Sequence, residues 1–219
     1  MILKTSILTL IPDKKMVDSA ATLRGYIADI FPENPLVHHH LTNSDNKRFI
    51  YSYPKIQYKV IDGIPLVLGI DEAIEVINGI SKIDQLHLKG KRYVVIEKKV
   101  SKQNVIFGIS ENINSYKFLT PWLALDEESY NRYRKRNQEE KKKQLESILI
   151  GNIISMAKGL EYVIIDKITA KVNVHEVQTS LKGTPMLGFL GTFSVNFEIP
   201  DYWGIGKSVS RGFGTVKKA

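Results

Sequence analysis

Strand-like and helix-like sequence patterns alternate along this 219-residue chain, and their order constrains the fold more than any other feature. Segments rich in β-branched and aromatic residues alternate with segments whose apolar residues recur every three or four positions. In chain order these are strand-like residues 2–10, helical residues 16–30, strand-like residues 48–53, 56–61 and 64–70, helical residues 74–80 after the candidate N-cap Asp71, and strand-like residues 85–88 and 91–100. This order predicts a ferredoxin-like β-α-β-β-α-β unit.

The second half repeats a plan of strand, helix and strands, with its second helix reduced or missing. We place the domain boundary in the polar residues 110–115, which gives domains at residues 1–110 and 111–219. After it we predict a strand at residues 116–125, one long helix from the N-cap Asp126 to near residue 159, and strands at residues 162–168, 170–177 and 188–199. The predicted fold class is α+β, with two tandem ferredoxin-like (RRM-like) domains and a C-terminal glycine-rich loop.

The charge of the chain and its lack of cysteine narrow the classes of function. Lysine and arginine number 31 against 23 acidic residues, a net charge of +8 that suits a polyanion such as nucleic acid. The absence of cysteine excludes disulfides, iron–sulfur clusters, cysteine nucleophiles and Cys-based zinc sites. No apolar run reaches the roughly eighteen residues of a membrane helix, and the first residues lack the basic region of a signal peptide. We therefore expect a cytoplasmic protein with no membrane partner.

The most informative segment is the glycine-rich stretch GIGKSVSRGFG at residues 204–214. Its glycines can adopt positive φ and let the backbone approach a ligand, and successive amides beside basic side chains form a cradle for phosphate. The candidate binding residues in it are Gly204, Gly206, Lys207, Ser208, Ser210, Arg211, Gly212 and Gly214. We therefore expect this stretch to hold a phosphate backbone.

The glycine-rich stretch could also be a Walker loop, a dinucleotide fingerprint or a plain turn. A Walker loop would end as Gly206-Lys207-Ser208 does, but it needs a glycine five residues earlier, where Asp201 stands. A dinucleotide fingerprint would need its third glycine at Val209. A tight hairpin whose glycines only turn the chain stays open.

The same stretch carries a resemblance to a known family. Two Gly-apolar-Gly triplets separated by five residues, basic ones among them, resemble the signature loop of the CRISPR-associated endoribonucleases that cut repeat RNA. These belong to the repeat-associated mysterious protein (RAMP) superfamily. Further segments resemble the type I-B-like branch, known from methanogens and clostridia: LRGY at residues 23–26, VHHH at 37–40, YSYPKIQ at 51–57 and TPWLAL at 120–125. They span both halves of the chain in the family's order.

The resemblance implies a fold, an activity and partners. It implies two tandem ferredoxin-like domains and metal-independent cutting of CRISPR repeat RNA in precursor transcripts, with no cofactor. The RNA would be the main partner, a CRISPR effector complex would receive the product, and a homodimer is compatible with the family. Two alternatives stay open: a non-catalytic RNA-binding subunit of an effector complex with the same fold, and a general nucleic-acid binder whose glycine loop is only a turn.

Three consecutive histidines, at residues 38–40, lie between the first helix and the next strands. In an extended segment His38 and His40 would share one face, with His39 opposite. RNA carries its own nucleophile, the 2′-hydroxyl, so two imidazoles can act as base and acid without a metal. The resemblance implies this role for His38 and His40 with Tyr51, leaving 5′-hydroxyl and 2′,3′-cyclic phosphate ends. Sequence does not say which histidine is the base, and the run could instead form a zinc site or be purely structural.

Further residues each have a functional and a structural interpretation. Tyr53 would share the strand face of Tyr51 and is the alternative candidate, although either can be a packed strand aromatic. We expect Arg24, on the first helix, to reach the cleft that holds the catalytic histidines and to bind RNA there, or else to be a solvated charge. The basic run at residues 141–143 is either an RNA contact or a solvated helix face. Two isolated histidines in strands are expected to be structural: His87 and His175.

Overall fold

The structure, a computed structural model, describes residues 1–38 and 53–219, which form two compact units. The N-terminal unit comprises Ile2–Val105 together with Val209–Gly212. The C-terminal unit comprises Met1, Ile106–Ser208 and Phe213–Ala219. The glycine-rich stretch is therefore divided between the two units.

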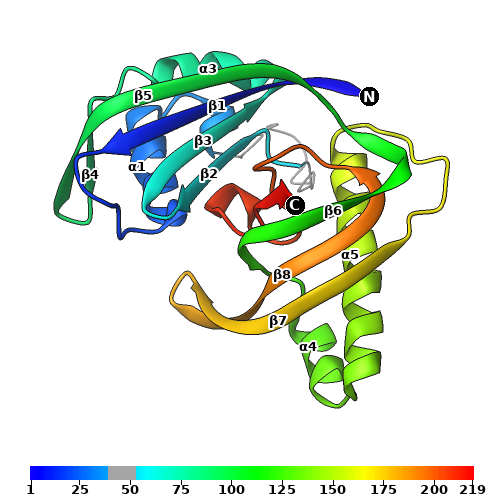
Figure 1. The fold of residues 1–219 in the computed structure, drawn as a ribbon. Helices are drawn as coiled ribbons and strands as arrows, with labels where there is room; N and C mark the ends of the chain where they lie inside the picture. The colour runs from blue at the N-terminus through cyan, green and yellow to red at the C-terminus, as the bar shows by residue number, and fades with distance from the viewer. Residues whose placement is uncertain (39–52) are drawn as a thin grey trace, which may run out of the picture. The chain divides into compact units, whose positions relative to one another are not determined.

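The N-terminal unit is built on a five-stranded sheet in the order β2-β3-β1-β5-β4 (Figure 1). Its elements are β1 (Ile2–Pro12), α1 (Ala20–Ile30), α2 (Pro35–His38), β2 (Ile56–Ile61), β3 (Ile64–Ile70), the 3-10 helix η1 (Asp71–Ala73), α3 (Ile74–Ile80), β4 (Gln85–Leu88), β5 (Lys91–Ile106) and the 3-10 helix η2 (Val209–Arg211). Strand β3 pairs antiparallel with both β1 and β2. With β5 as the fourth strand this is the ferredoxin-like order, and β4 is added as a hairpin with β5.

Helices α1 and α3 bury their apolar stripes in one core with the sheet (Figure 1). Leu23 and Ile27 of α1 and Ile77 and Ile80 of α3 are fully buried in it. Helix α1 begins four residues later than the apolar periodicity suggested, because the Ser19 side chain accepts a hydrogen bond from the helix's third amide and caps it there. The predicted helix–sheet packing of this half is thus present.

The predicted N-cap role of Asp71 is wrong. Its carboxylate accepts a hydrogen bond from the Lys4 amide at 2.9 Å, and neither η1 nor α3 has a capping hydrogen bond from a side chain. Asp71 itself adopts a φ of +49° and opens the 3-10 turn η1 ahead of α3. The Asp71 side chain therefore stabilises the start of β1 and does not cap a helix.

The C-terminal unit has a four-stranded sheet in the order β7-β8-β6-β9 (Figure 1). Its elements are β6 (Gly108–Trp122), α4 (Glu127–Arg134), α5 (Gln138–Gly159), β7 (Ala170–Leu181), β8 (Thr184–Glu198) and β9 (Val216–Lys218). This is the same strand order as in the first unit, and the described residues between β8 and β9 contain only the short η2 where a second helix would stand. The predicted α+β class with two tandem ferredoxin-like folds is confirmed.

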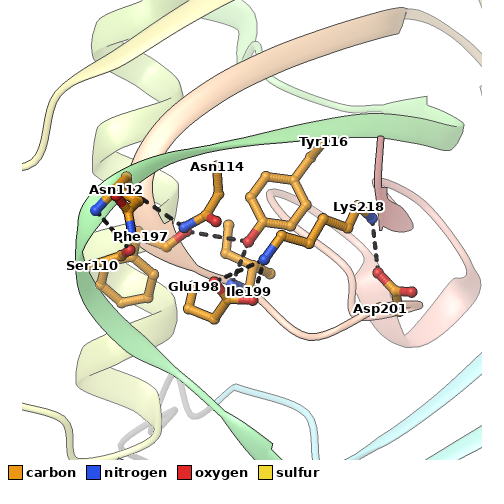
Figure 2. A network of polar contacts seen from close by, with 9 residues as sticks. All are labelled: Ser110, Asn112, Asn114, Tyr116, Phe197, Glu198, Ile199, Asp201 and Lys218. Atoms are coloured by element: carbon orange, nitrogen blue, oxygen red, sulfur yellow. Dashed lines mark hydrogen bonds and ion pairs between the residues drawn. The ribbon is translucent and has the colours of Figure 1, made fainter.

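The polar residues 110–115, expected to form a domain boundary, are part of β6. The register between β6 and β8 shifts within this stretch, and polar side chains bridge the irregularity. Figure 2 shows the Asn114 amide and the Tyr116 hydroxyl both donating to the Phe197 carbonyl, at 3.4 and 3.3 Å, while the hydroxyl accepts from the Ile199 amide at 2.9 Å. Burial raises the pKa of Tyr116, so the phenol stays protonated and can donate. The polar residues of this stretch therefore belong to a β-bulge and supply hydrogen bonds at it, and they do not form a linker.

The single long helix expected from Asp126 to residue 159 is two helices. Asp126 caps α4 as predicted, its carboxylate accepting from the Ser129 amide at 2.8 Å. A second capping box then starts α5, in which Asn137 and Glu140 each accept from the other's backbone amide at 3.0 Å. The sequence carries this signal in the spacing of the two residues. Within residues 1–38 and 53–219, no helix is long and apolar enough to cross a membrane.

The strand predicted at residues 162–168 is absent, and these residues have no regular secondary structure. Val163 and Ile165 are 77% and 84% exposed. β-Propensity describes how well a side chain packs on a sheet, so it forms no strand where no partner strand is paired.

Candidate nucleic-acid interface

Two of the predicted RNA-binding residues, Arg24 and Arg211, come together in the N-terminal unit. Arg24 lies on α1, one turn after Ala20, and η2 with Arg211 packs against α1 and β2. Gly212 makes this contact possible, because a Cβ there would lie 2.6 Å from the Ala20 Cβ and 3.0 Å from the Tyr58 carbonyl oxygen. Since residues four apart share a helix face, seating η2 on Ala20 brings Arg211 beside Arg24.

The electrostatics of this arginine pair favour an anion. Burial lowers the pKa of Arg24, and the like charge of Arg211 lowers it further, while Tyr58 acts in the opposite direction. The planar fork of donors on an arginine guanidinium group matches the oxygens of a phosphate. A phosphate bound between Arg24 and Arg211 would relieve their repulsion. The pair is therefore a candidate contact for the RNA backbone.

Tyr58 lies under this pair on β2, within the helix-packed core. Its side chain is fully buried, and burial raises the pKa of its hydroxyl. Among the described residues that hydroxyl has no hydrogen-bond partner. Tyr58 thus contributes a protonated, buried hydroxyl close to Arg24.

His38 is the last residue of the short helix α2, and only its backbone is described. Asn34 starts this turn, its side-chain oxygen accepting from the Leu36 amide at 3.1 Å. Val37 is buried in the same core as Leu23 of α1, which anchors the turn. The backbone at His38 is therefore a helical turn, and not the extended segment in which His38 and His40 would share one face.

The other expected catalytic residues, His40 and Tyr51, lie outside the described residues, as does His39. Tyr53, the alternative to Tyr51, is described and is 8% exposed. The structure therefore places the backbone of one proposed catalytic residue, and the roles of all three are left to biochemical tests.

The glycines of the 204–214 stretch have packing roles inside the protein. Gly204 is buried in a β-bridge of the C-terminal unit. A Cβ on Gly206, whose φ is +92°, would lie 2.6 Å from the Trp122 indole nitrogen. A Cβ on Gly214, whose φ is +62°, would lie 1.9 Å from the Ile205 carbonyl oxygen. We expected these glycines to make room for a phosphate, and the structure shows that the fold itself already requires them.

The hydrogen-bond donors between these glycines belong to both units. In the C-terminal unit the Lys207 amide donates to the Leu123 carbonyl at 3.3 Å, and its side chain, 44% exposed, lies 3.8 Å from the Asp126 carboxylate. Ser208 follows with a φ of +58°. Ser210 is half-buried on η2 of the N-terminal unit. The side chains expected to form one cradle therefore belong to two separately packed units.

Gly214→Ala should destabilise the protein far more than Gly183→Ala. Both glycines have positive φ, but nothing lies within 4 Å of a Cβ on Gly183, whereas one on Gly214 meets a carbonyl oxygen. We expect a loss of about 1–2 kcal/mol in the free energy of unfolding for Gly183→Ala, from φ alone. Gly214→Ala should lose at least twice as much in urea unfolding. Equal losses would show that the loop relaxes around the new methyl group.

Lys59 is a functional candidate that sequence reasoning missed. It lies on β2 with no exposed surface, and its ammonium donates to the Gln57 side-chain oxygen at 3.0 Å. Burial lowers its pKa to about 7, so the amine can exchange a proton near neutrality. Gly212 passes close by, since a Cβ there would lie 3.6 Å from the Lys59 Cα. Gln57 and Lys59 alternate with apolar residues, a pattern that predicts a solvent-facing side of the strand.

The unfolding free energy should rise with pH between about 7 and 10.5, the pKa of Lys59 in the folded protein and its ordinary value. In this window the unfolded chain holds a proton that the folded protein has lost, which gives at most about 1.4 kcal/mol per pH unit. Lys59→Met should abolish the rise in urea unfolding. Lys4→Met, at an exposed position of the same sheet, should keep it. Identical slopes for the parent and Lys59→Met would contradict the assignment.

Comparison with known proteins agrees with the fold along the whole chain. Residues 1–106 match the family model of the Cas6b N-terminal domain, and residues 108–219 match that of the Cas6b C-terminal domain. The chain belongs to the Cas6b family. The family resemblance that the glycine motif and its companion segments suggested is therefore confirmed.

Solved Cas6b structures resemble this one closely. A crystal structure of Cas6b is 37% identical with a TM-score of 0.90, and a crystal structure of the CRISPR RNA processing endoribonuclease Cas6b is 34% identical with a TM-score of 0.80; both comparisons cover each chain in full. An uncharacterized protein of Methanocaldococcus jannaschii is 44% identical over 138 residues, which is 63% of this chain and 94% of that protein. A Cas6-related protein from Pyrococcus furiosus, 15% identical with a TM-score of 0.62, shares the fold.

Proposed function

We propose that this Cas6b-family protein is an endoribonuclease that binds CRISPR repeat RNA in precursor transcripts and cuts it without a metal, in the cytoplasm. The observation that carries the proposal is the arginine pair Arg24–Arg211, on the same helix-packed core that anchors the turn ending at His38. A family relative at 34% identity is described as a CRISPR RNA processing endoribonuclease. An anion site and an imidazole pair are the two parts that such a cut needs.

The proposed chemistry uses the substrate's own nucleophile. One imidazole of His38 and His40 removes the proton of the 2′-hydroxyl, whose oxygen attacks the adjacent phosphorus. The other imidazole protonates the departing 5′-oxygen, which leaves a 2′,3′-cyclic phosphate and a 5′-hydroxyl. Tyr51 orients the phosphate or the nucleophile, and the guanidinium groups of Arg24 and Arg211 bind backbone phosphate. The released guide RNA passes to a CRISPR effector complex.

The proposal is tested by incubating end-labelled repeat RNA with the protein in excess EDTA. We expect one cut within each repeat, and excess unlabelled repeat should compete far better than unrelated RNA of equal length. Tight binding with no cut would support a non-catalytic RNA-binding subunit instead. Equal competition by unrelated RNA would support a general nucleic-acid binder. Gel filtration of the RNA complex distinguishes one bound chain from a homodimer.

Arg24→Ala with Arg211→Ala should weaken repeat binding and flatten its salt dependence. Each lost phosphate contact removes about 0.7 from the slope of log Kd against log salt for single-stranded RNA. The matched control is Lys89→Ala with Arg92→Ala, which removes the same charge from exposed positions at the β4–β5 hairpin. Affinity is measured by fluorescence anisotropy across a salt series. If both double variants lose slope equally, the arginine pair holds no particular phosphate.

A further inference from the structure

A concave site lies wholly within the C-terminal unit. Residues of α4, α5, β7 and β8 line a cavity of about 770 Å³, together with Lys207 of the glycine-rich stretch. Sites for drug-sized ligands span about 300–1,000 Å³. Of the proposed catalytic residues the structure describes only the backbone of His38, and His38 does not line this cavity.

One wall of the cavity carries an aromatic ring with a guanidinium over one of its faces. Tyr130 of α4 is 37% exposed, and Arg134 follows one turn later on the same helix face. The Arg134 guanidinium carbon lies 5.8 Å from the centre of the Tyr130 ring. Exposed aromatic faces and guanidinium planes are the surfaces on which proteins stack unpaired bases.

A second wall supplies fixed hydrogen-bonding groups. The Tyr133 hydroxyl donates to the Glu176 carboxylate at 2.9 Å, and the Lys141 ammonium lies 3.6 Å from the same oxygen. Gln178 follows two residues later on β7, on the same side of the strand, and also lines the cavity. A carboxylate and an amide can accept from and donate to the polar edge of a base. The lining balances three carboxylates, Asp126, Glu127 and Glu176, against three cations, Arg134, Lys141 and Lys207, so it has no net positive charge to favour a phosphate, and an uncharged base fits inside.

We propose that this cavity binds one unpaired nucleobase of the repeat RNA, a site that rests on the proposed function and adds to it. The base stacks on Tyr130 and its edge meets Glu176 and Gln178. Lys207 and Arg134 neutralise the phosphates on either side of that base. Lys207 makes the cavity continuous with the stretch expected to bind RNA, which favours RNA over a protein side chain as the occupant.

The test compares Tyr130→Ala with Tyr130→Phe, using repeat RNAs that each carry one abasic nucleotide. Loss of one base–aromatic stack should weaken binding by roughly tenfold, so Tyr130→Ala should lose about that factor while Tyr130→Phe stays near the parent. One abasic position should weaken binding to the parent by a similar factor. At that position alone, Tyr130→Ala should cause no further loss, because both changes remove the same contact.

Two further variants make the test independent of Tyr130. Arg134→Ala should weaken binding more than Arg132→Ala, since Arg132 lies on the same helix but ion-pairs with Glu128. Met186→Trp should weaken binding by filling the cavity from β8. Circular dichroism checks that each variant is folded.

The outcomes separate this proposal from the proposed function. If the parent binds and cuts the repeat but Tyr130→Ala, Arg134→Ala and Met186→Trp bind it equally well, the cavity takes no base and only this proposal is overturned. The proposal would also be overturned if the loss of affinity from Tyr130→Ala added to the loss from the abasic nucleotide at every position tested. If the parent neither binds nor cuts repeat RNA, the proposed function fails, and the cavity proposal fails with it.

Discussion

Alanine in place of both His38 and His40 should abolish cleavage of repeat RNA while the dissociation constant changes little. Each proton transfer by a positioned side chain contributes about 10²–10⁴-fold to the rate, so losing both should bring the rate to background. In the proposed mechanism, binding rests on phosphate contacts made by other residues, Arg24 and Arg211 among them. Single-turnover rate constants at saturating protein measure the loss without interference from affinity.

The matched control for the histidine variant is His87→Ala with His175→Ala. These two histidines are exposed on β4 and β7, and they should leave the rate at the parental level. A double variant at 38 and 40 that cuts at a rate near the parent's would exclude these histidines as the acid and base. Loss of the parent's cutting in EDTA, restored by added zinc, would favour a metal site at these histidines instead.

A repeat RNA with a 2′-deoxy nucleotide just before the cut should bind normally and stay whole. The proposed mechanism takes its nucleophile from that hydroxyl, and the chain contains no cysteine that could replace it. Removing the nucleophile should eliminate the cut product rather than slow its formation. The measurement is denaturing electrophoresis after a reaction long enough for the parent substrate to be consumed.

The control is the same RNA with the deoxy nucleotide moved two positions away from the cut. It should be cut at the parental position, because only one hydroxyl is in line with the scissile phosphorus. Normal cutting of the first analogue would mean that water is the nucleophile, and the cyclic-phosphate mechanism would have to be abandoned.

The strand order could be predicted from sequence where local patterns and topology agree. Apolar residues recur at helical spacing along α1, and a two-residue turn at Asp62 and Gly63 separates β2 from β3. Each of these elements can therefore be predicted from its own residues. The rules for connections between strands leave only a few possible topologies for this series of elements, and the ferredoxin-like strand order is one of them. The same reasoning gives the second unit, despite its missing second helix.

The errors occur where a local composition has two structural outcomes. The polar residues 110–115 could be a linker or a bulged strand. They form the strand, which is stabilised by hydrogen bonds from the side chains of Asn114 and Tyr116 to the Phe197 carbonyl. The apolar residues 162–168 could be a strand or an exposed connection, and they lack a strand partner. Neither outcome is visible until the elements are assembled in three dimensions.

The candidate site shows a similar limit. Sequence motifs singled out Arg24 and Arg211 separately, but their proximity depends on Gly212 seating η2 against Ala20, a contact between distant parts of the chain. The burial of Lys59 is equally non-local, because alternation along β2 predicts exposure there. Chemistry-bearing residue types can thus be read from the sequence, while their grouping and burial cannot.

The most direct test of the central claim is the chemistry of the RNA ends formed from repeat RNA in the presence of EDTA. The proposed mechanism predicts a 5′-hydroxyl on the downstream product, which polynucleotide kinase labels without prior phosphatase treatment. It also predicts an upstream product whose mass is that of a 2′,3′-cyclic phosphate. A 3′-hydroxyl paired with a 5′-phosphate, or a cut that disappears in EDTA and returns with magnesium, would contradict it.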